Sequence, residues 1–337
     1  MKKLLLASTA LVLSAGLANA QALNITGEGR MGVQGSNQTG TWVWNLENRL
    51  TLNFNVSVQA DHGLTFGAWA RARTGNTYAS PISGSRVWVE ANGLRVTFGN
   101  QDGAIRQSGV AFGYAGGCGV GYEGGQQCLD SVGLLSSHGQ NSTGPDNEQM
   151  AQLQYTMGDT RVNLSHGRTT GTELGIRTSF DAFTVAFGYG RYDAGTIGTV
   201  ANGDWTVTGV SAVQLFLDDT ITLSARYNGG SWSVGAIVAR ISTVAFQNIS
   251  AAGVPLGIVA ANNTWTNWQI NGSVALGGGT VYGFAGRVYD GNVVGVNYGY
   301  GLGGGATLSV GAEHIQDQFG VAGNDITTAS LGVAFNF

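Results

Sequence analysis

The feature that most constrains the fold is an alternation of apolar and polar residues with period two, which runs through almost the whole chain. Between residues 46 and 60 the two faces separate completely in chemistry. The apolar face holds Leu50, Leu52, Phe54, Val56 and Val58, and the polar face holds Glu47, Arg49, Thr51, Asn53, Asn55, Ser57 and Gln59. Such alternation predicts β-strands that meet apolar surroundings on one side and water on the other. We therefore expect an all-β chain.

The two ends of the chain decide between a soluble β-sandwich and a membrane barrel, since alternation alone fits both. Residues 1–20 begin with the basic Lys2 and Lys3, continue with an apolar run, and end on small residues that suit a cleavage site. This order is typical of a secretory signal peptide. Residues 329–337 form a strand with one continuous apolar face that ends on Phe337, as in barrels that face lipid. We predict a removed signal peptide over residues 1–20 and one transmembrane antiparallel β-barrel over residues 21–337.

Composition argues against other classes of protein. Hydrophobic residues make up 43% of the chain, yet no segment after residue 20 approaches the roughly 18 unbroken apolar residues of a membrane helix. Charged residues are only 11% and there are only 3 prolines, which does not fit a charged, disordered chain. The net charge of −4 gives no support to nucleic-acid binding.

Connection lengths predict the number of strands, because outer-membrane barrels alternate short periplasmic turns with longer external loops. The tight turns are expected at 60–63, 91–93, 157–160, 180–183, 228–231, 277–280 and 302–305. Eight longer connections surround them, at about 35–45, 75–84, 100–148, 168–172, 193–218, 242–264, 290–292 and 316–325. This pattern predicts sixteen strands, or eighteen if residues 205–217 form a strand of their own. Tyr155, Phe180, Phe183, Tyr227 and Trp232 stand near the turns, as expected for an aromatic girdle.

Four segments are informative together: the opening Thr26-Gly-Glu-Gly-Arg-Met-Gly-Val33, Gly99-Asn-Gln-Asp-Gly-Ala-Ile105, the late turn Gly301-Leu-Gly-Gly-Gly-Ala-Thr307, and the closing strand from Leu331 to Phe337. In these segments the chain resembles the general diffusion porins of the Gram-negative outer membrane, most closely their alphaproteobacterial branch. The resemblance implies a sixteen-stranded homotrimeric barrel whose long third loop folds into the lumen and narrows it. The enterobacterial Pro-Glu-Phe-Gly sequence is absent from this loop, and a cysteine pair stands there instead.

The third loop, residues 100–148, is far longer than ordinary connections. It carries the carboxylates of Asp102, Glu123 and Asp130. The polar faces of the preceding strands carry Arg30, Arg49, Arg71, Arg73, Arg86 and Arg95. If the loop folds inward, carboxylates face guanidinium groups across the narrowest part of the channel, and such charged rings select solutes by size and charge. The alternative is that these arginines are ordinary hydrated residues of a water-filled lumen.

Cys118 and Cys128 are the only cysteines, and both lie in the third loop. We expect a disulfide, because nearby thiols pair in an oxidising compartment and a thiolate metal site needs further close ligands. No metal site or cofactor is expected. Binding of Ca²⁺ by the acidic loop remains a weaker alternative, since the loop lacks EF-hand spacing.

Catalysis is not expected, because the four histidines have no partner in a recognisable motif. Ser165 and His166 are adjacent in a strand and so point to opposite faces. The sequence predicts an outer-membrane channel for passive diffusion of small hydrophilic solutes and ions, in contact with membrane lipid and lipopolysaccharide. A substrate-selective channel of the same fold and a non-conducting outer-membrane adhesin remain as alternatives.

Overall fold

The computed structural model describes residues 22–60, 62–75, 82–108, 150–193, 196–201 and 205–337. The strands within these residues are β1 (Ala22–Ser36), β2 (Val43–Gln59), β3 (Thr65–Gly75), β4 (Arg86–Ala91), β5 (Leu94–Gly99), β6 (Met150–Met157), β7 (Thr160–Gly167), β8 (Gly171–Phe180), β9 (Phe183–Arg191), β10 (Ile197–Ala201), β11 (Ala212–Asn228), β12 (Trp232–Ile249), β13 (Pro255–Leu276), β14 (Gly279–Val288), β15 (Gly291–Gly303), β16 (Ala306–Gln316) and β17 (Ile326–Asn336). The helical segments are α2 (Ala104–Ser108), α4 (Trp205–Thr208) and the 3₁₀ helix η2 (Gln318–Gly320). In the described residues, no helix is both long and apolar enough to cross a bilayer.

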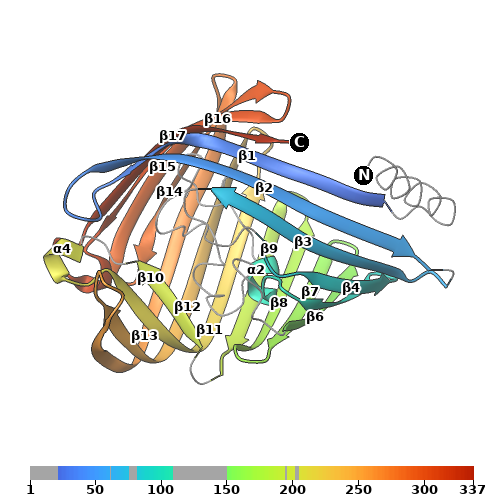
Figure 1. Cartoon of the computed structure of the whole chain (residues 1–337), viewed down its shortest axis with the longest axis horizontal. Helices are drawn as coiled ribbons and strands as arrows, with labels where there is room; N and C mark the ends of the chain where they lie inside the picture. Colours follow the sequence, from blue (N-terminus) through green and yellow to red (C-terminus); the bar gives the residue numbers. More distant parts are fainter. Residues whose placement is uncertain (1–21, 61, 76–81, 109–149, 194–195, 202–204) are drawn as a thin grey trace, which may run out of the picture.

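The strands close into an antiparallel barrel (Figure 1). Neighbours in sequence pair with each other, and β1 pairs with β17, where Gly27 N–H donates to Phe337 O at 2.8 Å and Phe337 N–H donates back at 3.0 Å. The short strand β10 is an addition, because β9 pairs directly with β11 while β10 pairs only with the outer end of β11. The closed wall therefore has sixteen strands, which confirms the sequence prediction.

All seven tight turns occur where the sequence predicts them. The turn between β4 and β5 shows why two residues suffice. Asn92 has φ of 50° and Gly93 has φ of 80°, so both adopt the left-handed conformation of a type I′ hairpin turn. Asparagine and glycine tolerate this conformation better than other residues.

Two of the outer connections differ from the prediction. The sequence predicts long loops at 193–218 and 242–264, but residues 212–218 belong to β11 and the hairpin of β12 and β13 continues to residues 249 and 255. The alternative of a separate strand over residues 205–217 is not observed, because Trp205–Thr208 form the short helix α4 and residues 212–217 belong to β11. Register shifts near residues 216–219 and 246–249 mark β-bulges, which interrupt the simple alternation that the sequence analysis relied on.

The outward face of the barrel is apolar. On β1, Leu23, Ile25 and Met31 are each about half exposed, as expected for side chains that meet lipid. On β17, the rings of Phe335 and Phe337 lie over Gly29 and Gly27, so that the outward glycines of β1 are covered by aromatic side chains.

The predicted aromatic girdle is present next to the periplasmic turns. Phe180, Phe183, Tyr227 and Trp232 form a continuous row, with successive ring centroids 5.7, 4.9 and 5.2 Å apart. Tyr155 also lies exposed near the turn after β6.

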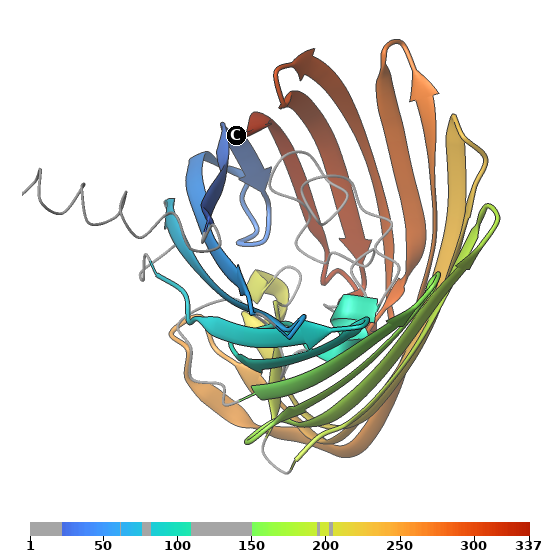
Figure 2. The same cartoon turned by 90° about the vertical axis from the view of Figure 1, so that its right-hand side faces the viewer.

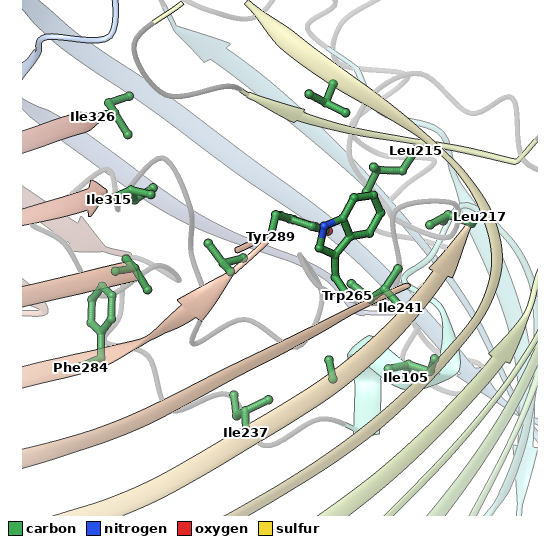
Figure 3. Packing of buried hydrophobic residues seen from close by; sticks show 14 of the residues in the cluster. Ile105, Leu215, Leu217, Ile237, Ile241, Trp265, Phe284, Tyr289, Ile315 and Ile326 are labelled. Carbon is green, nitrogen blue, oxygen red and sulfur yellow. The ribbon is translucent and has the colours of Figure 1, made fainter. Parts of the chain in front are cut away.

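The interior is not polar all round, in contrast to the expectation from alternation. A buried apolar cluster lies inside the wall of β11 to β15 towards the external loops (Figure 3). It includes Leu215, Leu217, Ile241, Trp265 and Tyr289, each at most 4% exposed. The inner positions near the outer end of β11 are Val213, Leu215 and Leu217, whereas below the bulge they are Thr220, Thr222 and Ser224. Apart from this cluster, inner positions on several strands are polar, as at Thr51 of β2, Asn163 of β7 and Asn297 of β15.

Candidate functional site

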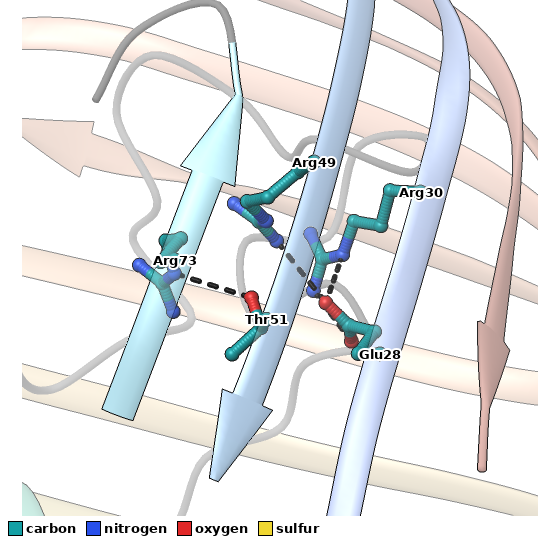
Figure 4. A network of polar contacts seen from close by, with 5 residues as sticks. All are labelled: Glu28, Arg30, Arg49, Thr51 and Arg73. Carbon is teal, nitrogen blue, oxygen red and sulfur yellow. Dashed lines mark hydrogen bonds and ion pairs between the residues drawn. The ribbon is translucent and has the colours of Figure 1, made fainter. Parts of the chain in front are cut away.

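The six predicted arginines all occupy inward-facing positions on β1 to β5, which we call the arginine wall: Arg30, Arg49, Arg71, Arg73, Arg86 and Arg95. Arg30 on β1 stands directly opposite Arg49 on β2 in the strand register. On the other side of β2, Thr51 stands opposite Arg73 of β3, whose Nε donates to Thr51 Oγ1 at 3.3 Å. Figure 4 shows these side chains on one face of three adjacent strands.

One carboxylate organises the first part of this wall. Glu28 Oε1 accepts a hydrogen bond from Arg30 Nε at 2.5 Å, and it also lies 3.4 Å from a terminal nitrogen of Arg49. Arg30 completes a bidentate pair through Glu28 Oε2 at 3.0 Å. Bidentate pairing fixes the plane of a guanidinium group as well as its position. The sequence analysis does not identify Glu28 as the partner of two arginines, although Glu28 stands two residues from Arg30 on the same face of the strand.

Open space lies beside the wall. A polar recess of about 630 Å³ borders Thr26, Glu28, Arg30, Thr51, Asn53, Arg71, Arg73 and Asn336. Arg30, Arg71 and Arg73 therefore border open space large enough for several water molecules.

Two tryptophans that the sequence analysis did not single out face the same interior. The guanidinium carbon of Arg86 lies 4.0 Å from the centroid of the Trp69 ring, and that of Arg71 lies 5.6 Å from the same centroid. Arg95 lies 5.2 Å from the Trp88 ring, and its Nε donates to Glu90 at 2.6 Å. Spacing in the sequence could have indicated these contacts, because each tryptophan stands two residues from an arginine and therefore shares its face of the strand.

The inner face carries further arginines beyond β5. Arg161 on β7 stands opposite Arg177 on β8, and Arg226 lies on the inner face of β11. Arg161 donates to the carbonyl of Gln107 near the end of α2. The sequence analysis considered only the strands before the third loop and so missed this second group.

The start of the third loop turns into the barrel, where α2 lies inside the ring of strands (Figure 2). Its first N–H groups are held by the inner wall, because Ala104 N–H donates to Ser165 Oγ at 2.8 Å and Ile105 N–H donates to Glu173 Oε2 at 3.1 Å. Glu173 is fully buried, and its other oxygen accepts from Tyr192 Oη at 3.1 Å. α2 is thus attached to the inner face of β7 to β9.

Glycines make this attachment possible. A Cβ atom on Gly175 would come within 2.2 Å of Ala104 O, and one on Gly188 would come within 2.9 Å of the Ile105 side chain. Real Cβ atoms do not approach so closely, so only glycine lets α2 reach the strands.

The acidic half of the predicted site is described only in part. Asp102 lies just before α2 and forms an ion pair with Arg106, with 3.5 Å between Oδ1 and Nε. Glu123, Asp130, Cys118 and Cys128 lie outside the described residues, as does most of the predicted loop, so the predicted field and disulfide stay predictions. Among the described residues, no group of three or more His, Cys, Asp or Glu side chains is placed to hold a metal ion. Binding of Ca²⁺ likewise stays untested.

Ser165 and His166 have separate environments, as the strand geometry predicts. Ser165 is buried and caps α2, while His166 is exposed and its Nδ1 lies 2.9 Å from Thr172 Oγ1. The two side chains do not form a nucleophile and base pair.

Comparison with known proteins agrees with this architecture. A family model described as Gram-negative porin matches residues 7–337, which is nearly the whole chain. The chain belongs to the Gram-negative porin family. This porin is therefore an outer-membrane channel for small solutes in a Gram-negative bacterium, in a family and fold of non-enzymatic channels.

Solved structures show the same fold at low sequence identity. One variant of the Rhodopseudomonas blastica porin is 20% identical, with a TM-score of 0.64, and a second is 21% identical, with a TM-score of 0.63. Each match covers 94% of this chain and 100% of the other. A search of curated proteins found no match.

Proposed function

We propose that this porin allows small hydrophilic solutes and ions to diffuse passively through its lumen, and that the arginine wall sets its preference for charge. The observation that carries this proposal is the polar recess of about 630 Å³ beside Arg30, Arg71 and Arg73. Guanidinium groups stay charged at every physiological pH, so the wall offers permanent positive charge to a passing solute.

Hydrated diffusion down a gradient is the mechanism. Solutes are proposed to pass along the arginine wall, through the lumen into which the start of the third loop turns. Anions are attracted to the guanidinium groups, and cations are repelled by them, to an extent that falls with ionic strength. Carboxylates of residues 109–148 are proposed to oppose the arginine wall and to balance its field.

We also propose that three copies assemble and that residues 1–20 are removed as a signal peptide during export. The outward face of β2 to β5 supports assembly, because Phe66, Val87 and Phe98 are exposed around an apolar groove of about 400 Å³. The remaining outward surface is proposed to contact lipid and lipopolysaccharide.

Planar-bilayer recording tests the proposal. The mature protein is expected to insert with conductance steps in groups of three and to show a reversal potential in a salt gradient. Removal of one positive charge from the wall, Arg73→Gln, is expected to shift this potential towards cation preference. Arg240→Gln is the matched control, because Arg240 lies on the outward face of β12.

A barrel that inserts but does not conduct would refute the diffusion channel and favour an adhesin. Conductance that saturates with one solute would instead assign a substrate-selective channel. Equal shifts of the reversal potential in Arg73→Gln and Arg240→Gln would show that the arginine wall does not set the charge selectivity.

A further inference from the structure

We propose that Trp69 and Trp88 are positioning residues of the pore, which hold Arg71, Arg86 and Arg95 against the wall and thereby keep the lumen open. This inference rests on the proposed function, since it concerns the charges that line the diffusion path. It assigns to the two indole rings a role in conduction instead of a role in packing alone.

The first contact group crosses from β3 to β4. Trp69 stands directly opposite Arg86 in the strand register, and both face the interior. The guanidinium carbon of Arg86 lies 4.0 Å from the ring centroid, which is a close cation–π contact. Arg71 follows two positions later on the same face of β3 and lies 5.6 Å from the same ring. Trp69 is only 9% exposed, so the arginines and neighbouring residues cover it.

The second contact group crosses from β4 to β5. Trp88 stands opposite Gly67, and its ring atoms come within 2.1 Å of the position that a Cβ on Gly67 would occupy. The indole can therefore lie against the backbone of β3, where any larger residue would displace it. Arg95 lies 5.2 Å from this ring and is also bound by Glu90, so it is held from two sides.

These contacts restrain side chains that would otherwise be long and mobile. A cation–π contact at a partly desolvated site shifts the ratio of docked to free guanidinium by roughly two- to thirtyfold. A docked arginine keeps its charge at the wall. A free arginine extends into the lumen, where it reduces the open cross-section and moves on the timescale of exposed side chains.

The test compares single-channel currents of Trp69→Leu and Trp69→Phe with those of the unmodified protein. Trp69→Leu is expected to lower the open-channel conductance and to raise the current noise, whereas Trp69→Phe retains an aromatic face and is expected to recover most of both. Trp268→Leu is the matched control, since Trp268 lies exposed on the outward face of β13. Heat-modifiable migration on gels confirms that each variant is a folded barrel.

A double-mutant cycle separates positioning from simple loss of bulk. If Trp69 acts through Arg71 and Arg86, Trp69→Leu has little further effect on conductance and noise in a background that carries both Arg71→Gln and Arg86→Gln. Equal effects in both backgrounds, or no effect of Trp69→Leu at all, would overturn the inference. If Trp69→Leu does not fold, Trp88→Leu with and without Arg95→Gln decides by the same criterion. Failure of the unmodified protein to conduct would instead refute the proposed function.

Discussion

Replacement of Gly175 by alanine tests how the start of the third loop is held inside the barrel. The new Cβ would lie 2.2 Å from Ala104 O and 2.4 Å from Ser108 Oγ. Because the nearer atom belongs to the backbone, no side-chain rotation relieves the overlap, and α2 must move by about 1 Å to restore van der Waals contact. Such a shift would stretch the hydrogen bonds from Ala104 to Ser165 and from Ile105 to Glu173, now 2.8 and 3.1 Å.

Overpacking of this kind costs about 1–3 kcal/mol, which corresponds to roughly a 5- to 150-fold rise in the detached population of α2. Hydrogen–deuterium exchange of a peptide that covers residues 100–108 measures this population directly. Gly301→Ala is the matched control, because a Cβ there meets nothing within 4 Å. Unchanged exchange in a folded Gly175→Ala barrel would refute the view that close backbone contact holds α2.

Three further changes test separate parts of the structure. Glu28→Gln removes a negative charge between two arginines, so the reversal potential is expected to shift towards anion preference in a salt gradient; a shift towards cations would contradict this reading. Phe335→Ala uncovers Gly29 and is expected to cost about 0.5–1 kcal/mol, seen as a lower temperature for loss of the folded gel band. Burial, and then the neighbouring Glu173, raises the pKa of Tyr192 well above 10.0. The folded protein therefore favours the neutral phenol, so the part of the stability that depends on Tyr192 is expected to be full below pH 10 and to fall as the pH rises towards the raised value. Tyr192→Phe is expected to weaken this dependence, while the buried Tyr289, whose pKa is also raised, still contributes in the same direction.

Much of the barrel could be predicted from sequence because side-chain direction in a strand is a local property. Arg49 and Arg73 point inward, and Leu50 points outward, for the same reason: successive residues alternate faces. The tight turns were equally predictable, since residues such as Asn92 and Gly93 adopt conformations that few other residues tolerate.

The sequence predictions that were wrong or incomplete have identifiable physical causes. The bulges in β11 and β12 break the period of two, so the sequence analysis ended these strands too early and assigned their outer parts to loops. The apolar interior near Leu217 and Trp265 was missed because alternation does not tell whether an apolar face meets lipid outside the barrel or a buried cluster inside it.

The sequence by itself determined the all-β class, the positions of the turns, and the side of each strand on which the arginines of β1 to β5 lie. Only the tertiary structure decided what those side chains contact. The register between strands places Trp69 beside Arg86, and closure of the barrel brings Glu173 to α2, although Ile105 lies 68 positions earlier in the chain. Alternation is set by the geometry of each strand alone, whereas contacts across strands depend on the register and curvature of the whole sheet.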